Sequence, residues 1–287
     1  MKPEQKSTLL LSRTRSRAKM YEYNVPDELH TELTTHPSRL MSLAIGMLGD
    51  YAANICDIPI SVRLDRQDQS SDLNFPAYYF DAYYQARLGT TIQPYIKLLG
   101  SASYYLSNLP GGALVLIKDI ESNGFDLDAS GFEHLIFSIL RGDADIITVN
   151  ASRFETELTE LNGNLSVYRK TGLDSEPLFI SINNLRNQVY RQGSARELLF
   201  VDVAGALIRV MYENSCWRCL PEYSNLPVSI WENTIKRASF IKELWPAQRL
   251  LGKQGVFEGR SAVIQMPTSA GKTRATEIII RSAFLAK

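Results

Sequence analysis

Apolar residues recur at helical spacing through most of the first 225 residues of this 287-residue chain. One clear series follows Pro37, with apolar side chains at Leu40, Ala44, Met47, Leu48, Tyr51 and Ile55. Residues three and four apart share one face of a helix, so this series predicts an amphipathic helix that buries one stripe. Pro37 suits its first turn, and Thr34 or Thr35 is available as its cap.

Further segments alternate between helix and loop signals. Acidic and hydroxyl residues crowd residues 62–76, which we predict to be a polar loop. Residues 98–109 favour a helix that Pro-Gly-Gly at residues 110–112 is expected to stop, and residues 113–120 fit a helix or a strand equally well.

Two helix starts in the second half carry capping residues. Ser130 is expected to cap a helix that ends near Gly142. Ser194 and Glu197 have the spacing of a capping box, and they open a nearly continuous apolar run over residues 198–211. A helix that is apolar on all sides has to be buried, so this run predicts a central helix.

Two local biases leave alternatives open. The first 20 residues hold six basic residues and one acidic residue, which fits an arm that touches phosphates or a frayed, solvated terminus. Residues 75–84 are rich in Phe and Tyr, which fits a base-stacking surface or a buried helix face. The solvated terminus and the buried face are the simpler interpretations.

Composition sets the broad class. Hydrophobic residues make up 45% of the chain and charged residues 22%, as in ordinary globular proteins, and Lys plus Arg equals Asp plus Glu at 31 each. No apolar run approaches the ~18 residues of a membrane span. Three cysteines (Cys56, Cys216 and Cys219) favour a reducing, cytoplasmic setting. The Cys-x-x-Cys spacing at residues 216–219 fits half a zinc site or a redox pair, and most simply two ordinary thiols.

Chemistry concentrates near the C-terminal end of the sequence. Residues 262–266 predict a buried strand, residues 267–273 a polar turn, and residues 274–286 an amphipathic helix. This order is typical of a phosphate-binding loop, in which backbone N–H groups at the helix start point at a polyphosphate. In such a loop a glycine permits close approach, a lysine contacts the β- and γ-phosphates, and a threonine hydroxyl binds Mg²⁺; here these are Gly271, Lys272 and Thr273.

The strict pattern asks for Gly where this chain has Met266, and the form present is Pro-Thr-x-x-Gly-Lys-Thr. That form resembles motif I of superfamily 2 DEAD- and DExH-box helicases. The resemblance implies that ATP and Mg²⁺ are bound by Thr268, Ser269, Ala270, Gly271, Lys272 and Thr273, with Thr273 as the metal contact. Trp-Pro-x-Gln, ending at Gln248, resembles the Q-motif of the same family, in which the glutamine reads the adenine edge. Trp231, with Phe240 as a competitor, is a weaker counterpart of the adenine-stacking aromatic, and a core role suits both.

The Ser-Ala pair of the loop and the Trp-Pro-x-Gln form are similar to the Ski-like DExH branch. The preceding helical region resembles the helicase subunit of Hachiman-type phage-defence systems. These resemblances imply a mainly α accessory domain over residues 1–225, then the incomplete start of an α/β RecA-like domain over residues 226–287. The implied partners are DNA or RNA and possible partner proteins such as a nuclease, with no membrane.

The sequence holds no acidic motif after the loop and no second RecA-like domain, so we expect ATP binding without hydrolysis by these 287 residues, as the N-terminal portion of a longer helicase. Residues 27–30 spell Asp-Glu-Leu-His, but they precede the loop and read as acidic residues that start a helix. Two rival hypotheses are a non-catalytic interaction module and a P-loop enzyme of another class, such as a small-molecule kinase.

Overall fold

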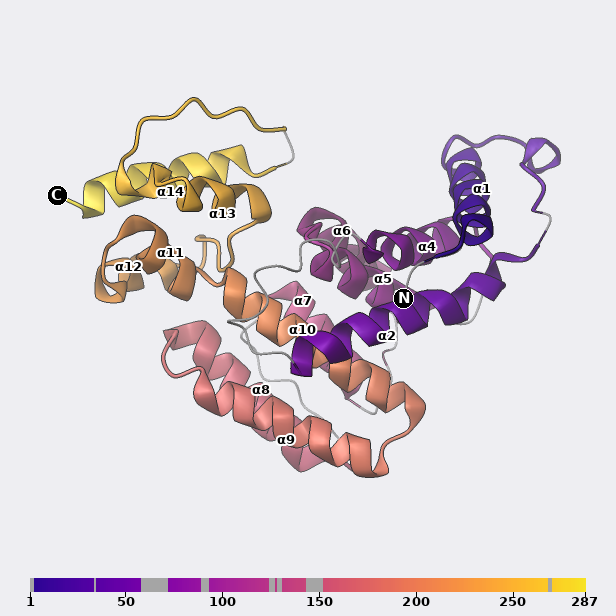
Figure 1. Cartoon of the computed structure of the whole chain (residues 1–287), viewed down its shortest axis with the longest axis horizontal. Coiled ribbons are helices and arrows are strands. Elements are labelled where there is room, and N and C mark those ends of the chain that lie inside the picture. Colours follow the sequence, from indigo (N-terminus) through magenta and orange to yellow (C-terminus); the bar gives the residue numbers. More distant parts are fainter. Residues whose placement is uncertain are drawn as a thin grey trace.

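The computed structural model describes residues 3–33, 35–57, 72–88, 93–123, 127, 131–142, 152–267 and 270–287. In these ranges the regular elements are helices, and the one extended pairing is an isolated antiparallel bridge between Ser215 and Glu243 (Figure 1). The helices are α1 (Gln5–Glu22), η1 (Asp27–Leu29), η2 (Pro37–Leu40), α2 (Met41–Asp57), α4 (Asn74–Gln85), α5 (Gln93–Leu106), α6 (Pro110–Asn123), α7 (Phe132–Arg141), α8 (Glu155–Thr171), α9 (Glu176–Gln192), α10 (Ala195–Asn214), α11 (Cys216–Ser224), α12 (Val228–Ile235), α13 (Pro246–Lys253), η4 (Val256–Glu258) and α14 (Lys272–Leu285).

Helix α10 is the centre of the N-terminal part, as the apolar run predicted. It contacts α2, α5, α7 and α9, and Figure 1 shows it running diagonally between α2 on one side and the α8–α9 pair on the other. The predicted capping box is also confirmed: Ser194 N donates to Glu197 Oε2 at 2.7 Å, and Glu197 N donates to Ser194 Oγ at 3.3 Å. Capping and burial therefore agree on where this helix begins.

The buried apolar residues form two main clusters. The larger runs from Leu11 to Met211 and binds together α1 to α10, which we call the helical body (residues 3–214). The smaller runs from Cys216 to Ile278 and holds together α11 to α14, which we call the C-terminal unit (residues 216–287). Figure 1 shows this unit beyond the C-terminal end of α10. The boundary between the two apolar clusters therefore lies next to Ser215. The domain division at residue 225 stays a prediction.

The N-terminal segments differ in detail from expectation. The basic segment is the 18-residue helix α1, whose Leu11 and Ala18 are buried and which packs on α4, so it is not a frayed terminus. The helix after Pro37 is confirmed as η2 followed by α2, but His36 is its cap, because His36 Nδ1 accepts from Ser38 N at 3.2 Å. The tetrapeptide at residues 27–30 begins the 3₁₀ helix η1, as predicted.

The helix predicted over residues 98–109 is confirmed as part of α5, which ends at Leu106, short of the predicted stop. Pro110 begins α6, since proline fits the first helical turn, and residues 113–120 are helix rather than strand. Much of the predicted polar loop and Ser130 lie outside the described residues. α4 already begins at Asn74, and α7 ends as predicted, with Gly142 in the left-handed conformation after it.

The predicted start of an α/β RecA-like domain is wrong. Residues 262–266 run as extended chain without a strand partner among the described residues, and Figure 1 shows this segment arching away from α13 and α14. Val263 is 102% exposed. A strand exists only through hydrogen bonds to a neighbouring strand, so apolar composition alone does not make one. The helix predicted after the turn is confirmed as α14.

Candidate functional site

The turn that enters α14 has the geometry of a helix N-terminus open to solvent. Gly271 is the N-cap residue in the left-handed conformation, with φ +84°, and its carbonyl accepts from Ala275 N at 3.0 Å. Lys272 and Thr273 follow in the first turn with exposed side chains. The first N–H groups of a helix lack intrahelical partners, and the helix dipole adds partial positive charge there. This end of α14 therefore favours an anion.

Gln248 supports this turn through a hydrogen bond to the turn's backbone. It is 2% exposed, and its Nε2 donates to the Gly271 carbonyl at 3.3 Å, while its Oε1 accepts from Trp245 N at 2.9 Å. The side chain thus joins the start of α13 to a turn far along the chain. A Cβ on Gly271 would lie 2.7 Å from Gln248 Nε2, so both the backbone conformation and the close approach require glycine here.

The geometry of Gln248 differs from the base-reading role that the resemblance implies. Both ends of its amide are engaged by backbone groups, and the side chain is buried. Each end of the amide keeps one further hydrogen-bonding position, but only 2% of the residue is exposed, which leaves little of the amide accessible to an adenine edge. In this arrangement Gln248 is a positioning residue for the turn.

Two hollows flank the turn. One, of about 440 Å³, lies against the helical body and is lined in part by Gln248, Gly271 and Arg274. The other, of about 840 Å³, lies between α12 and α14 and is lined by Lys272, Thr273, Thr276, Glu277, Ile280, Arg281, Phe284, Leu285, Thr234 and Arg237. Gln248 and Lys272 therefore line different hollows, although Gln248 is hydrogen-bonded to Gly271 and Lys272 follows Gly271 in the chain.

Positive charge dominates the second hollow. Glu277 pairs with Arg274 at 2.9 Å and with Arg281 at 2.9 Å, so these three charges largely satisfy one another. Lys272 and the exposed Arg237 add two further cations to the hollow. The arrangement suits a polyanion at the start of α14.

The remaining residues of the predicted loop are placed only in part. Ala270 is half-buried, and its N–H donates to Pro267 O at 3.1 Å; Thr268 and Ser269 lie outside the described residues. In the described part of the chain no group of three or more His, Cys, Asp or Glu could hold a metal ion, and the Thr273 hydroxyl is exposed at the start of α14. A Mg²⁺ ion there would rely on phosphate oxygens and water for its other ligands.

The two aromatic candidates upstream are core residues. Trp231 is completely buried and its Nε1 donates to Ser224 Oγ at 2.8 Å. Phe240 is buried, with the Arg281 guanidinium 5.6 Å from the ring centre. Both belong to the apolar cluster of the C-terminal unit. The core role that suited them in the sequence is confirmed.

The Cys-x-x-Cys pair consists of buried free thiols at the start of α11. Burial raises the pKa of Cys219 to about 11 and that of Cys216 well above its usual value. Redox and metal-binding cysteines act as thiolates and need a lowered pKa. Cys219 instead donates to Glu213 O at 3.1 Å, so these are ordinary structural thiols.

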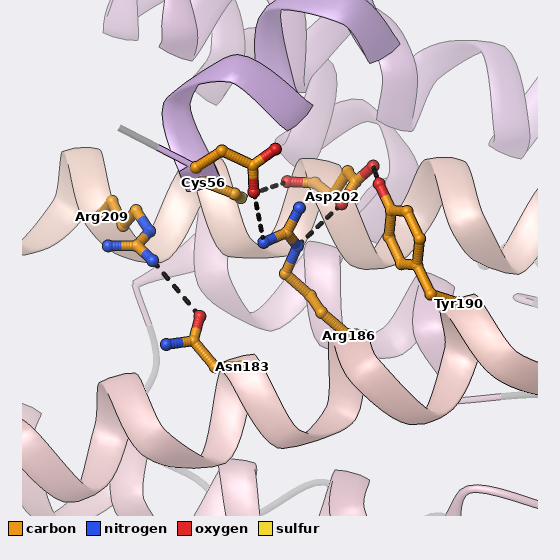
Figure 2. A network of polar contacts seen from close by, with 7 residues as sticks. Cys56, Asn183, Arg186, Tyr190, Asp202 and Arg209 are labelled. Carbon is orange, nitrogen blue, oxygen red and sulfur yellow. Dashed lines mark hydrogen bonds and ion pairs between the residues drawn. The ribbon is translucent and has the colours of Figure 1, made fainter. Parts of the chain in front are cut away.

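Sequence reasoning missed a polar network between helices of the helical body, shown in Figure 2. Arg186 of α9 donates to Asp202 of α10 at 2.8 Å and to Asp57 of α2 at 3.1 Å, and Tyr190 OH donates to Asp202 Oδ2 at 2.6 Å. The Cys56 thiol donates to the Asp202 carbonyl at 3.5 Å. One acidic residue within the apolar run of α10 was the available signal. The network joins three helices and has a structural role.

Comparison of the chain with protein-family models, with curated proteins and with solved structures finds no match. In the described ranges, no helix combines the length and the apolar character that crossing a bilayer requires.

Proposed function

We propose that the turn at residues 270–273 binds the phosphates of ATP and that the chain is part of an ATP-dependent nucleic-acid helicase or translocase similar to the DExH type. The observation that carries the proposal is the exposed Lys272–Thr273 pair in the first turn of α14, directly after a left-handed glycine that buried Gln248 supports. Phosphate binding at such a helix start follows from its free N–H groups and dipole. The helicase part rests on the motif resemblance.

Each residue has a defined task in this proposal. The Lys272 ammonium contacts the β- and γ-phosphates, and the Thr273 hydroxyl contributes one ligand to Mg²⁺. Gly271 lets the backbone approach the phosphates. Gln248 donates a hydrogen bond to the Gly271 carbonyl and so holds that oxygen away from the phosphates in this proposal. The proposal includes a cytoplasmic location.

Calorimetric titration of the full chain tests the proposal, with Mg²⁺-ATP and with inorganic triphosphate as ligands. Lys272→Ala should weaken the binding of both ligands by at least about tenfold, because the same ammonium contacts the phosphates of each ligand. Lys253→Ala removes an exposed lysine at the end of α13 and is the matched control, with no expected change. Equal affinities for wild type and Lys272→Ala would refute phosphate binding at this turn.

A second candidate is a non-catalytic interaction module. Its support is the separation of the two apolar clusters, because the helical body buries its own core without α11 to α14. It predicts that residues 1–225 alone fold cooperatively and retain binding of a partner protein. Loss of cooperative unfolding in that fragment would exclude this candidate.

A further inference from the structure

A groove of about 1010 Å³ lies between α1 and α4, at the end of the helical body remote from α14 (Figure 1). Its α1 wall consists of Thr8, Ser12, Arg15, Ser16, Lys19 and Tyr23, with Leu11, Ala18 and Met20 below them. At 100° per residue the first six fall within an arc of about 100°, so α1 presents one stripe of cations, hydroxyls and a tyrosine over about 22 Å.

The facing wall combines aromatic side chains with polar and acidic ones: Asp72, Phe75, Tyr78, Asp81, Ala82, Gln85 and the largely buried Tyr104. Tyr78 of α4 and Tyr104 of α5 line it, with their ring centres 6.0 Å apart in an edge-on arrangement. The Arg15 guanidinium lies 4.3 Å from the centre of the Tyr78 ring. A guanidinium stacked on a tyrosine forms a flat, positively charged platform on which a base can stack. Tyr23, 72% exposed, offers a second ring at the end of the same groove.

Two acids line the same groove, and Asp81 interacts electrostatically with Arg15 and Lys19, whose side chains remain exposed to solvent. Both carboxylate oxygens of Asp81 accept from neutral donors, Tyr104 OH at 2.9 Å and Gln85 Nε2 at 2.7 Å. Lys19 pairs with Glu22 at 2.5 Å, but both side chains are at least half exposed, so a phosphate can replace the carboxylate. Asp72 is the other acid of the groove.

We propose that this groove binds single-stranded nucleic acid, with Arg15 and Lys19 at the phosphates and with bases stacked on the Arg15–Tyr78 pair and on Tyr23. The tertiary structure brings together two features that lie apart in the sequence, the basic N-terminal segment and the aromatic segment. Stacking platforms of this kind take unpaired bases, whereas a duplex keeps its base faces covered. This proposal does not depend on phosphate binding at Lys272.

Fluorescence anisotropy with the full chain tests the groove, using a labelled oligothymidine of about 20 nucleotides, longer than the ~4–16 nucleotides of common single-strand sites. The double variant Arg15→Gln, Lys19→Gln should bind at least about tenfold more weakly. Its slope of log K against log salt should shrink by about 1.4, which corresponds to two lost phosphate contacts. Lys6→Gln, on the opposite side of α1, is the matched control and should change affinity less than about twofold.

Stacking is tested separately from charge. Tyr23→Leu keeps an apolar side chain at an exposed position and should weaken binding by at least about fivefold, the effect of losing one stacked base. A strand carrying 5-bromouracil should crosslink to groove tyrosines. Lys272→Ala should bind the strand as wild type does, whatever its effect on ATP.

The proposal would be overturned by no binding of the oligothymidine by wild type, by equal losses for Lys6→Gln and the double variant, or by tighter binding of a duplex of the same length. Crosslinks confined to the C-terminal unit would overturn it as well. Loss of ATP binding by Lys272→Ala with strand binding retained supports the groove, while unchanged ATP binding would count only against the nucleotide site.

Discussion

The helical body and the C-terminal unit cover their apolar side chains to different extents. In the body, successive helices bury one another, and residues such as Leu207 and Val203 of α10 are completely inaccessible. The C-terminal unit packs around Trp231 and Phe257 and exposes seven large apolar side chains, at Val228, Ile230, Leu250, Val263, Ile264, Ile280 and Phe284. The described part of the helical body is more than twice as long and exposes nine.

The difference shows what apolar periodicity can predict. It identifies the side chains that should be covered, and in the body the neighbouring helices supply the cover. In the C-terminal unit the apolar run at residues 262–266 meets no covering element in the described part of the chain. A pattern that was sufficient for helices was therefore insufficient for a strand.

Removing one large core side chain from each region should separate their stabilities most clearly. Phe200→Ala in α10 and Trp231→Ala in α12 should each cost about 3–5 kcal/mol, because both side chains are buried. Hydrogen exchange should show that Trp231→Ala opens α11 to α14 and leaves α10 protected. Uniform loss of protection over both regions would contradict two separate cores.

The polar network around Asp202 offers a second test of the comparison within the helical body. Arg186→Ala leaves the buried Asp202 carboxylate without its ion pair and should lower the free energy of unfolding by about 3 kcal/mol. Arg191→Ala, an exposed position at the end of the same helix, should change it by less than about 0.5 kcal/mol. Urea titrations compare the two, and equal effects would deny the network a structural role.

Alkaline pH probes one thiol in each region. Burial raises the pKa of Cys56 in the body and of Cys219 in the C-terminal unit from 9.0 to about 11. The unfolded thiol loses its proton first, so the contribution of each thiol is complete below about pH 9 and is lost as pH rises to about 11. Each should account for roughly 2–3 kcal/mol. The free energy of unfolding, plotted against pH between 9 and 11, should fall less steeply for Cys56→Ala and Cys219→Ala than for wild type. Unchanged slopes would refute the raised pKa values.

Alanine substitutions at two left-handed glycines of the C-terminal unit separate the cost of backbone strain from the cost of a steric clash at Cβ. Gly259→Ala introduces only backbone strain, at φ +96° with open space around its Cβ, and should cost about 1 kcal/mol. Gly271→Ala adds the contact with Gln248 and should cost about 1–2 kcal/mol. On the proposed function, only Gly271→Ala should weaken ATP binding, as calorimetry can measure. Equal binding losses would indicate a general effect of unfolding.

The smallest effect is expected at the exposed run. Val263→Ser should change the free energy of unfolding by less than about 0.5 kcal/mol, because Val263 is exposed in the folded chain. Val203→Ser in the buried face of α10 should cost about 2–3 kcal/mol. A large cost at Val263 would show that residues 262–266 are covered in solution.

The candidate site was predictable where local rules decide it. The turn and helix around Gly271 to Thr273 follow from residue type and spacing, and α14 begins at Lys272. The bond from Gln248 to the Gly271 carbonyl was not predictable, because the resemblance assigned that amide to a base. The α1–α4 groove was missed because each wall, taken alone, has a simpler interpretation.

The amino-acid sequence by itself determined most of the helices, the capping box at Ser194 and the burial of α10, because these depend on residues within a few positions of one another. Tertiary structure decided the rest: which thiols are buried, that Gln248 supports the turn, that Arg15 meets Tyr78, and that residues 262–266 form no strand. Those outcomes depend on partners distant in sequence, and period and composition carry no information about which distant partner is in reach.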